Sequence, residues 1–119
     1  MIQLRRYEIV PGELDAFVDW WQSTMPALRT EAGFTIEFAY VNEDANEFVW
    51  AVGVPGRLEN FARVDAAYRA SEARRRVFAD LPERVAKAHV SFVRPALDDP
   101  SAGRGHDTES ERFARGREH

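Results

Sequence analysis

Three side chains with complementary chemistry alternate near the start of the chain, at Gln3, Arg5 and Tyr7. Residues two apart on a β-strand point to the same face of a sheet, so this spacing predicts one row of polar and aromatic groups. A guanidinium can hold a carboxylate or an enolate by charge-assisted hydrogen bonds, and a phenol can donate a proton or a hydrogen bond. The row is therefore a candidate binding site for an anionic substrate. The alternative is a polar seam in a dimer interface, where Tyr and Arg are common.

Two further polar residues lie in segments that alternate in the same way. His89 is the only histidine within residues 1–97, and its imidazole could act as a general base or ligate haem. A lone histidine is more often a structural residue held by a hydrogen bond. Glu37 could be a buried base, a partner for Arg5 across the sheet, or simply exposed. Tyr7, His89 and Arg5 are thus the catalytic candidates, provided that one pocket holds all three.

The tryptophans Trp20, Trp21 and Trp50 could line a pocket for an aromatic ligand. Trp21 lies on the helix stripe and is better suited to the hydrophobic core, and Trp50 could equally anchor a dimer interface. The candidate ligand-binding residues are accordingly Gln3, Arg5, Tyr7, Glu37, Trp50 and His89.

The composition argues against several other functions. The net charge of −4 does not favour a nucleic-acid site, and the arginines at 74–76 would point in different directions on a helix and be solvated. There is no cysteine, glycine-rich phosphate loop, G-x-S-x-G elbow or His/Asp cluster, so neither a metal nor a cofactor is predicted. The chain enters a strand at once and has no apolar run near 18 residues. We therefore expect a cytoplasmic protein without a membrane span.

The spacing of the apolar residues predicts the elements that must position these groups. Alternation predicts strands at 2–10, 35–41, 47–54 and 87–94, and helical spacing predicts helices from about 13 to 32 and from 57 to about 85. Pro26 is expected to kink or interrupt the first helix, and Gly33 to end it. Ser71 is expected to cap a separate helix, which Pro82 would end or bend. This order is the βαββαβ plan of the ferredoxin-like α+β fold, a four-stranded antiparallel sheet with helices on one face.

Both faces of the predicted sheet carry apolar residues. Ile36, Phe38 and Tyr40 would share one face of their strand. Leu4 is suited to burial under the helices, which would place the row of Gln3, Arg5 and Tyr7 on the open face. A sheet that faces water on one side normally has a more polar open face, so we expect something to cover it.

The composition changes at Asp98, after which Phe113 is the only large apolar residue. Such a segment cannot bury enough surface to offset the conformational entropy lost on folding. The sequence therefore predicts one domain at residues 1–97 and a disordered C-terminal tail at 98–119.

The opening segment IQLRRYEIVPGELDAF, followed by Trp20 and Trp21, resembles the NIPSNAP-type members of the dimeric α/β-barrel superfamily. An aromatic-rich third strand and an Arg- and Ala-rich helical pair, at 68–79, fit the same resemblance, which covers about residues 2–96. It implies that the open sheet faces of two subunits pack together and close a barrel. Members of this superfamily keep cavities between sheet and helices or inside the barrel. Some carry out cofactor-free oxygenation, isomerisation or cyclisation, others bind haem, and many have no known activity.

Three hypotheses follow from the residues and the resemblance together. The first is a homodimer, formed through the open sheet face, that binds a small hydrophobic or aromatic molecule. The second is a cofactor-free monooxygenase, isomerase or cyclase acting on an aromatic or polyketide-like substrate. In it Tyr7 or His89 moves a proton and Arg5 holds an enolate or carboxylate. The third is a non-catalytic assembly module.

Overall fold

The computed structural model describes residues 1–97, which form four strands and three helices. The elements are β1 (Ile2–Ile9), α1 (Leu14–Glu31), β2 (Thr35–Asn42), β3 (Glu47–Gly53), α2 (Leu58–Arg69), α3 (Glu72–Phe78) and β4 (Val85–Val93). This is the ferredoxin-like α+β architecture predicted from the sequence. The predicted disordered tail falls at 98–119, outside the described residues.

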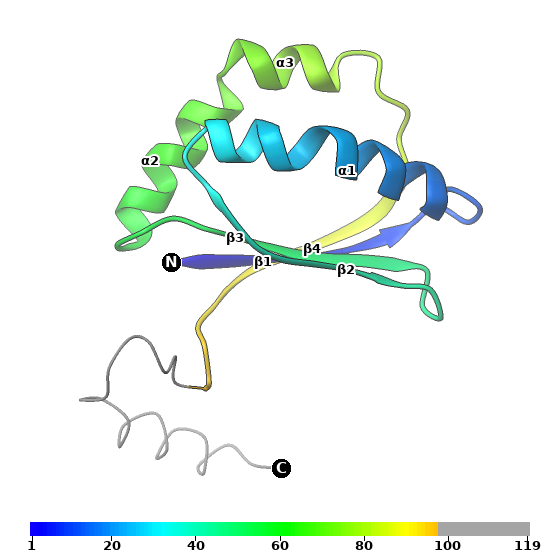
Figure 1. Ribbon diagram of the computed structural model, residues 1–119, viewed down its shortest axis with the longest axis horizontal. Helices are drawn as coiled ribbons and strands as arrows, with labels where there is room; N and C mark the ends of the chain where they lie inside the picture. Colours follow the sequence, from blue (N-terminus) through cyan, green and yellow to red (C-terminus); the bar gives the residue numbers. More distant parts are fainter. Residues whose placement is uncertain (98–119) are drawn as a thin grey trace.

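The four strands form one antiparallel sheet in the order β2-β3-β1-β4, so β3 and β1 are central. All three helices lie on the same side of the sheet (Figure 1). Within residues 1–97 no helix covers the other side, which we call the open face. Every residue of a strand therefore points either into the layer between sheet and helices or onto the open face.

The core lies between α1 and β3. The helix buries one stripe, made of Phe17, Trp21, Met25 and Leu28 at the predicted spacing of three and four residues. The stripe meets aromatic rings of β3: the ring centroids of Trp21 and Phe48 are 5.0 Å apart, and those of Trp21 and Trp50 are 5.3 Å apart. Trp50 is only 1% exposed, which puts this central strand at the middle of the packed layer.

Helix α1 ends at Glu31, two residues before the predicted stop signal Gly33. The backbone N–H of Gly33 donates to the carbonyl of Thr30, and that of Phe34 donates to the carbonyl of Arg29. This pair of bonds satisfies the last carbonyls of the helix and requires a left-handed residue between helix and strand, which Gly33 supplies with a φ of 108°.

We expect Gly33→Ala to lower the free energy of unfolding by about 1–2 kcal/mol, because an L-residue is strained at this φ. A Cβ at this position would lie 3.5 Å from Val64 Cγ1, an ordinary contact, so backbone strain rather than a clash sets the loss. Urea unfolding measures it. Gly33→Asn is the matched control and should lose less, since Asn tolerates left-handed conformations; equal losses for both would contradict this explanation.

The helices differ in two details from the predictions. Of the two effects predicted for Pro26, the interruption is absent: α1 continues through Pro26, because one missing N–H is outweighed by the long apolar stripe on both sides of it. The last helix begins as predicted, with Ser71 Oγ accepting from the N–H of Arg74 at 3.2 Å. It ends earlier than predicted, at Phe78, because Ala79 is extended and Asp80 adopts a φ of 59°. Leu81 and Pro82 consequently lie in the loop before β4.

A β-bulge in β2 separates residues that were predicted to share one face of that strand. Ile36 pairs with Val52 and Phe38 with Ala51, so Glu37 is an extra residue without its own partner. Ile36 therefore points toward the helices, whereas Phe38 points to the open face. Tyr40 follows Phe38 and is 68% exposed. The prediction that Ile36, Phe38 and Tyr40 share a face is thus wrong, because strict alternation ends at the bulge.

The row of Gln3, Arg5 and Tyr7 also lies on the side opposite to the one predicted. Gln3 is buried, and Tyr7 packs edge-on against Phe17 of α1, with ring centroids 5.9 Å apart. All three residues therefore face the helices, and Leu4 faces the open side. The polar row is tolerated there because its members hydrogen-bond to one another, as described below.

Candidate functional site

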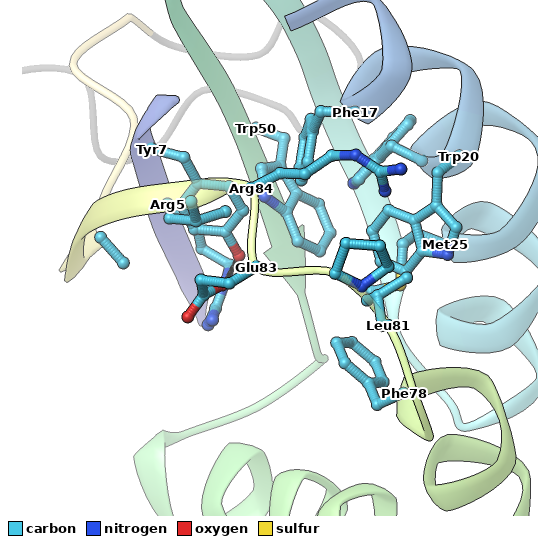
Figure 2. A pocket seen from close by; sticks show the side chains of 14 residues that line it. Arg5, Tyr7, Phe17, Trp20, Met25, Trp50, Phe78, Leu81, Glu83 and Arg84 are labelled. Carbon is cyan, nitrogen blue, oxygen red and sulfur yellow. Dashed lines mark hydrogen bonds between the residues drawn. The ribbon is translucent and has the colours of Figure 1, made fainter. Parts of the chain in front are cut away.

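A cavity of about 350 Å³ lies between the sheet and the helices. Its walls come from β1, β3, β4, α1 and α3, and from the loop that leads into β4 (Figure 2). The lining is mainly aromatic and aliphatic, with a few polar groups from β1 and from the loop. The lining residues are Arg5, Tyr7, Phe17, Trp20, Trp21, Met25, Trp50, Phe78, Leu81, Pro82, Glu83, Arg84, Val85 and Ala88. Ligand sites of proteins have this apolar character and start at about this volume.

The polar lining residues of β1, Arg5 and Tyr7, belong to a short hydrogen-bonded chain along that strand. Arg5 Nε donates to Tyr7 Oη at 2.8 Å, and Arg5 Nη1 donates to Gln3 Oε1 at 2.6 Å. Because Tyr7 accepts from Arg5, its own O–H is left to donate to a ligand. In Figure 2 Arg5 and Tyr7 stand on one side of the site, and Trp20 and Met25 of α1 on the other. The predicted grouping of Arg5 and Tyr7 is therefore present, in the cavity rather than on the open face.

Of the three roles predicted for the tryptophans, namely ligand pocket, hydrophobic core and dimer interface, the structure agrees with the first two. Trp21 belongs to the core, as predicted, and also lines the cavity together with Trp20 and Trp50. Trp50 faces the helices, so its alternative role as an anchor of an interface on the open face is wrong. The indole N–H groups of Trp21 and Trp50 are buried and donate to no protein acceptor among the described residues.

Arg29 of α1 is a charged residue of this layer that sequence reasoning did not single out. It is 4% exposed, and its guanidinium carbon lies 4.2 Å from the ring centroid of Tyr68, 4.7 Å from that of Phe34 and 5.2 Å from that of Trp50. Burial lowers the pKa of Arg29. The signal was its position four residues after Met25, which puts it on the buried stripe of α1. An arginine in the last turn of a helix is usually taken as exposed and favoured by the helix dipole.

His89 does not share the cavity with Arg5 and Tyr7. It pairs with Arg6 across the sheet, and its Nε2 lies 2.7 Å from Glu8 Oε2 on the open face. Arg5 points to the helices, so the sheet separates it from His89. The condition set for the three catalytic candidates is therefore not met, and the hydrogen-bonded structural role proposed as the alternative for His89 is the one observed.

The hydrogen bond from His89 holds the pKa of Glu8 below its ordinary value, with smaller contributions from the charges of His89, Lys87 and Arg6. A carboxyl group whose pKa is lowered on folding stabilises the protein above its unfolded pKa, near 4.3, and loses that contribution as pH falls through its folded pKa.

We therefore expect the wild-type melting temperature to fall more steeply than that of Glu8→Gln between about pH 5 and pH 3, with a small difference because both side chains are partly exposed to solvent. Thermal melts across this range measure the effect. Glu59→Gln, an exposed change on α2, is the control and should follow the wild type. A Glu8→Gln curve parallel to the wild type would contradict the assignment.

The remaining candidates lie outside the cavity lining. Glu37 is exposed at the bulge on the open face. Of the three roles considered for it, simple exposure is therefore the one observed, and a pairing with Arg5 is excluded. Arg75 and Arg76 form surface ion pairs with Glu72, as the solvated reading predicts. Arg74 differs, because it turns inward over the ring of Phe78 at 4.4 Å.

Among residues 1–97 no group of three or more His, Asp or Glu side chains is arranged to hold a metal ion. In that same part of the chain, no helix combines the length and apolarity that a membrane crossing needs. The only histidine there, His89, is engaged by Glu8 on the open face, so this cavity offers no imidazole to a haem iron.

The arrangement is a ferredoxin-like domain with an aromatic cavity under its helices, and solved structures share this fold. A NIPSNAP domain protein from Burkholderia xenovorans superimposes with a TM-score of 0.72 at 15% identity, over 83% of this chain and 97% of that one. A NIPSNAP family protein of unknown function from Agrobacterium tumefaciens gives 0.72 at 16% identity, over 83% and 90%.

A putative antibiotic biosynthesis monooxygenase from Bacteroides thetaiotaomicron is similar at a lower level. Its TM-score is 0.56 at 13% identity, over 82% of this chain and 90% of that one. No protein-family model matches the sequence, and no curated protein sequence matches it either. The chain therefore has the fold of NIPSNAP domain proteins, as the resemblance in its sequence implied.

Proposed function

We propose that this NIPSNAP-like protein is a homodimer that binds a small organic molecule in the cavity between its sheet and its helices. The observation that carries the proposal is the cavity itself, about 350 Å³ in volume, with an aromatic lining and a polar wall of Arg5 and Tyr7. At roughly 30 Å³ for each water-sized group, this volume suits a ligand of on the order of a dozen non-hydrogen atoms. Aromatic walls favour a flat, apolar body.

The open face supports the dimer. Phe38 is 36% exposed and Tyr40 68%. On the side without helices Phe38 pairs with Ala51 and Tyr40 with Val49, and Leu4 lies on the other side of Ala51. Contiguous apolar groups on a small domain are a usual sign of an interface, and about 800 Å² per partner is a typical size for a stable one. The ion pair of Arg6 and Glu47, at 2.6 Å, supplies a polar rim to this patch.

Catalysis that needs Arg5, Tyr7 and His89 in one pocket is not supported, since the sheet separates His89 from the cavity that Arg5 and Tyr7 line. A purely assembling role would use the open face alone and would leave the cavity unexplained. Ligand binding in a dimer uses both features. A cytoplasmic location remains the expectation from the sequence.

Native mass spectrometry of the protein purified from its own host tests the proposal. We expect a dimer that carries an additional small-molecule mass, released when the protein is denatured. If the dimer carries no added mass and also binds no member of a library of small aromatic compounds, the proposal that the cavity binds a ligand is wrong. A monomer at micromolar concentration would overturn the dimer.

A further inference from the structure

Arginine side chains and aromatic rings alternate beneath the helices, from β1 across α1 to α3. We call this series the arginine ladder; it comprises Arg5, Arg29 and Arg74 with the rings of Tyr7, Trp50, Tyr68 and Phe78. Neighbouring arginines share a ring: Arg5 and Arg29 both lie over Trp50, and Arg29 and Arg74 both lie over Tyr68. Four members of the ladder line the cavity: Arg5 and Tyr7 at one end, Trp50, and Phe78 at the other end.

Within residues 1–97 the three arginines of the ladder form no ion pair. Asp65 is the acidic residue whose charge reaches Arg29, but Arg69 Nε already donates to Asp65 Oδ2 at 2.8 Å. Arg5 donates only to the neutral groups of Gln3 and Tyr7. Rings stabilise a cation through their faces, yet a buried charge normally also has an anion to compensate it.

The same region contains an excess of unused hydrogen-bond donors. The buried side-chain atoms without a protein partner are Trp21 Nε1, Trp50 Nε1, Arg29 Nε, Arg29 Nη1, Arg74 Nε and Tyr68 Oη. Five of these six atoms can only donate, and the sixth is a hydroxyl. Native proteins rarely leave such groups unsatisfied. Trp21 and Trp50 line the cavity, so an acceptor bound there would satisfy their indole N–H groups.

From the ladder and its unused donors we infer that the ligand is an organic anion, a flat aromatic acid whose carboxylate binds at the Arg5 and Tyr7 wall of the cavity. Its ring system lies among Trp20, Trp21 and Phe78, and the indole N–H groups supply further donors. Arg29 does not line the cavity but stands behind Trp50, so it acts on the carboxylate as a positioning charge. This inference rests on the proposed function, because it specifies what the same cavity takes.

Calorimetric titration of the full chain with two matched probes tests the inference. The probes are naphthalene-2-carboxylate and naphthalene-2-carboxamide, which have nearly the same shape but differ in charge at neutral pH. We expect the acid to bind roughly ten- to a hundredfold more tightly than the amide, the usual advantage of a charged hydrogen bond. Equal affinities would overturn the inference while leaving a ligand-binding cavity in place. Binding of neither probe would overturn the proposed function as well, for ligands of this size.

Variants separate the charge of the ladder from its packing. Arg29→Met keeps an unbranched apolar stem in the buried site, and we expect it to reduce the preference for the acid at least about threefold while the amide binds as before. Arg74→Met, at a half-buried position, is the second variant should Arg29→Met not fold. Arg75→Met is the control, since Arg75 is next to Arg74 in the sequence but pairs with Glu72 on the surface. An unchanged preference in both ladder variants would mean that the ladder is only structural.

Discussion

Trp50→Ala is expected to lower the melting temperature by on the order of 15–30 °C. Trp50 is 1% exposed and contacts Trp21 and Tyr7 edge-on, with the guanidinium of Arg29 5.2 Å from its ring. Truncating a buried tryptophan costs about 3–5 kcal/mol, and in a domain of this size each kcal/mol shifts the melting temperature by about 4–8 °C. Thermal denaturation followed by circular dichroism measures the effect.

Two further variants identify the cause of this loss. Trp50→Phe keeps a ring over Arg29 and removes the unused indole N–H, so we expect a much smaller decrease. Leu58→Ala changes a side chain that is 48% exposed on α2 and should leave the melting temperature within a few degrees of the wild type. A loss for Trp50→Ala as small as that for Leu58→Ala would contradict the central place of Trp50 in the core.

Phe38→Arg is expected to convert the proposed dimer into a monomer. Phe38 lies on the open face beside Ala51, and a guanidinium there would be buried without a partner in each half of the interface. An unpaired buried charge costs several kcal/mol, and each 1.4 kcal/mol is tenfold in affinity. The dissociation constant should therefore rise at least about a hundredfold, which sedimentation velocity over a dilution series can measure.

The monomer itself should tolerate this change, because Phe38 is already 36% exposed in the isolated chain. Leu58→Arg adds the same charge to the helical side, at a similarly exposed position, and should leave the dimer intact. If both variants remain dimeric, the interface lies on another surface. If both become monomeric, charge alone and not the position on the open face would be responsible.

The order of the elements could be predicted because it depends on periodicity. The stripe of Phe17, Trp21, Met25 and Leu28 has the spacing of an amphipathic helix with one buried side, and Gly33 follows its end. Local interactions of this kind act over three or four residues and are visible in the sequence itself.

The faces of the strands could not be predicted in the same way. The apolar character of Leu4 suggested the helical side for it, and Arg5 and Tyr7 were assigned to the open side. In the structure these residues lie on the opposite faces, because a cavity and the faces of aromatic rings can accommodate the guanidinium of Arg5 on the helical side. The burial of Arg29 could not be predicted for the same reason. The rings that shield its charge, Trp50 and Tyr68, belong to elements distant in the sequence.

The bulge at Glu37 has a bearing on how related chains would be compared with this one. On either side of it Ile36 faces inward and Phe38 outward, as they would if they were direct neighbours on a regular strand. A chain that lacked Glu37 would consequently present the same side chains to each face, with one residue fewer and no distortion. Its alignment with this sequence would contain a single-residue gap in mid-strand, where an ungapped alignment would assign every later position of the strand to the wrong side of the sheet.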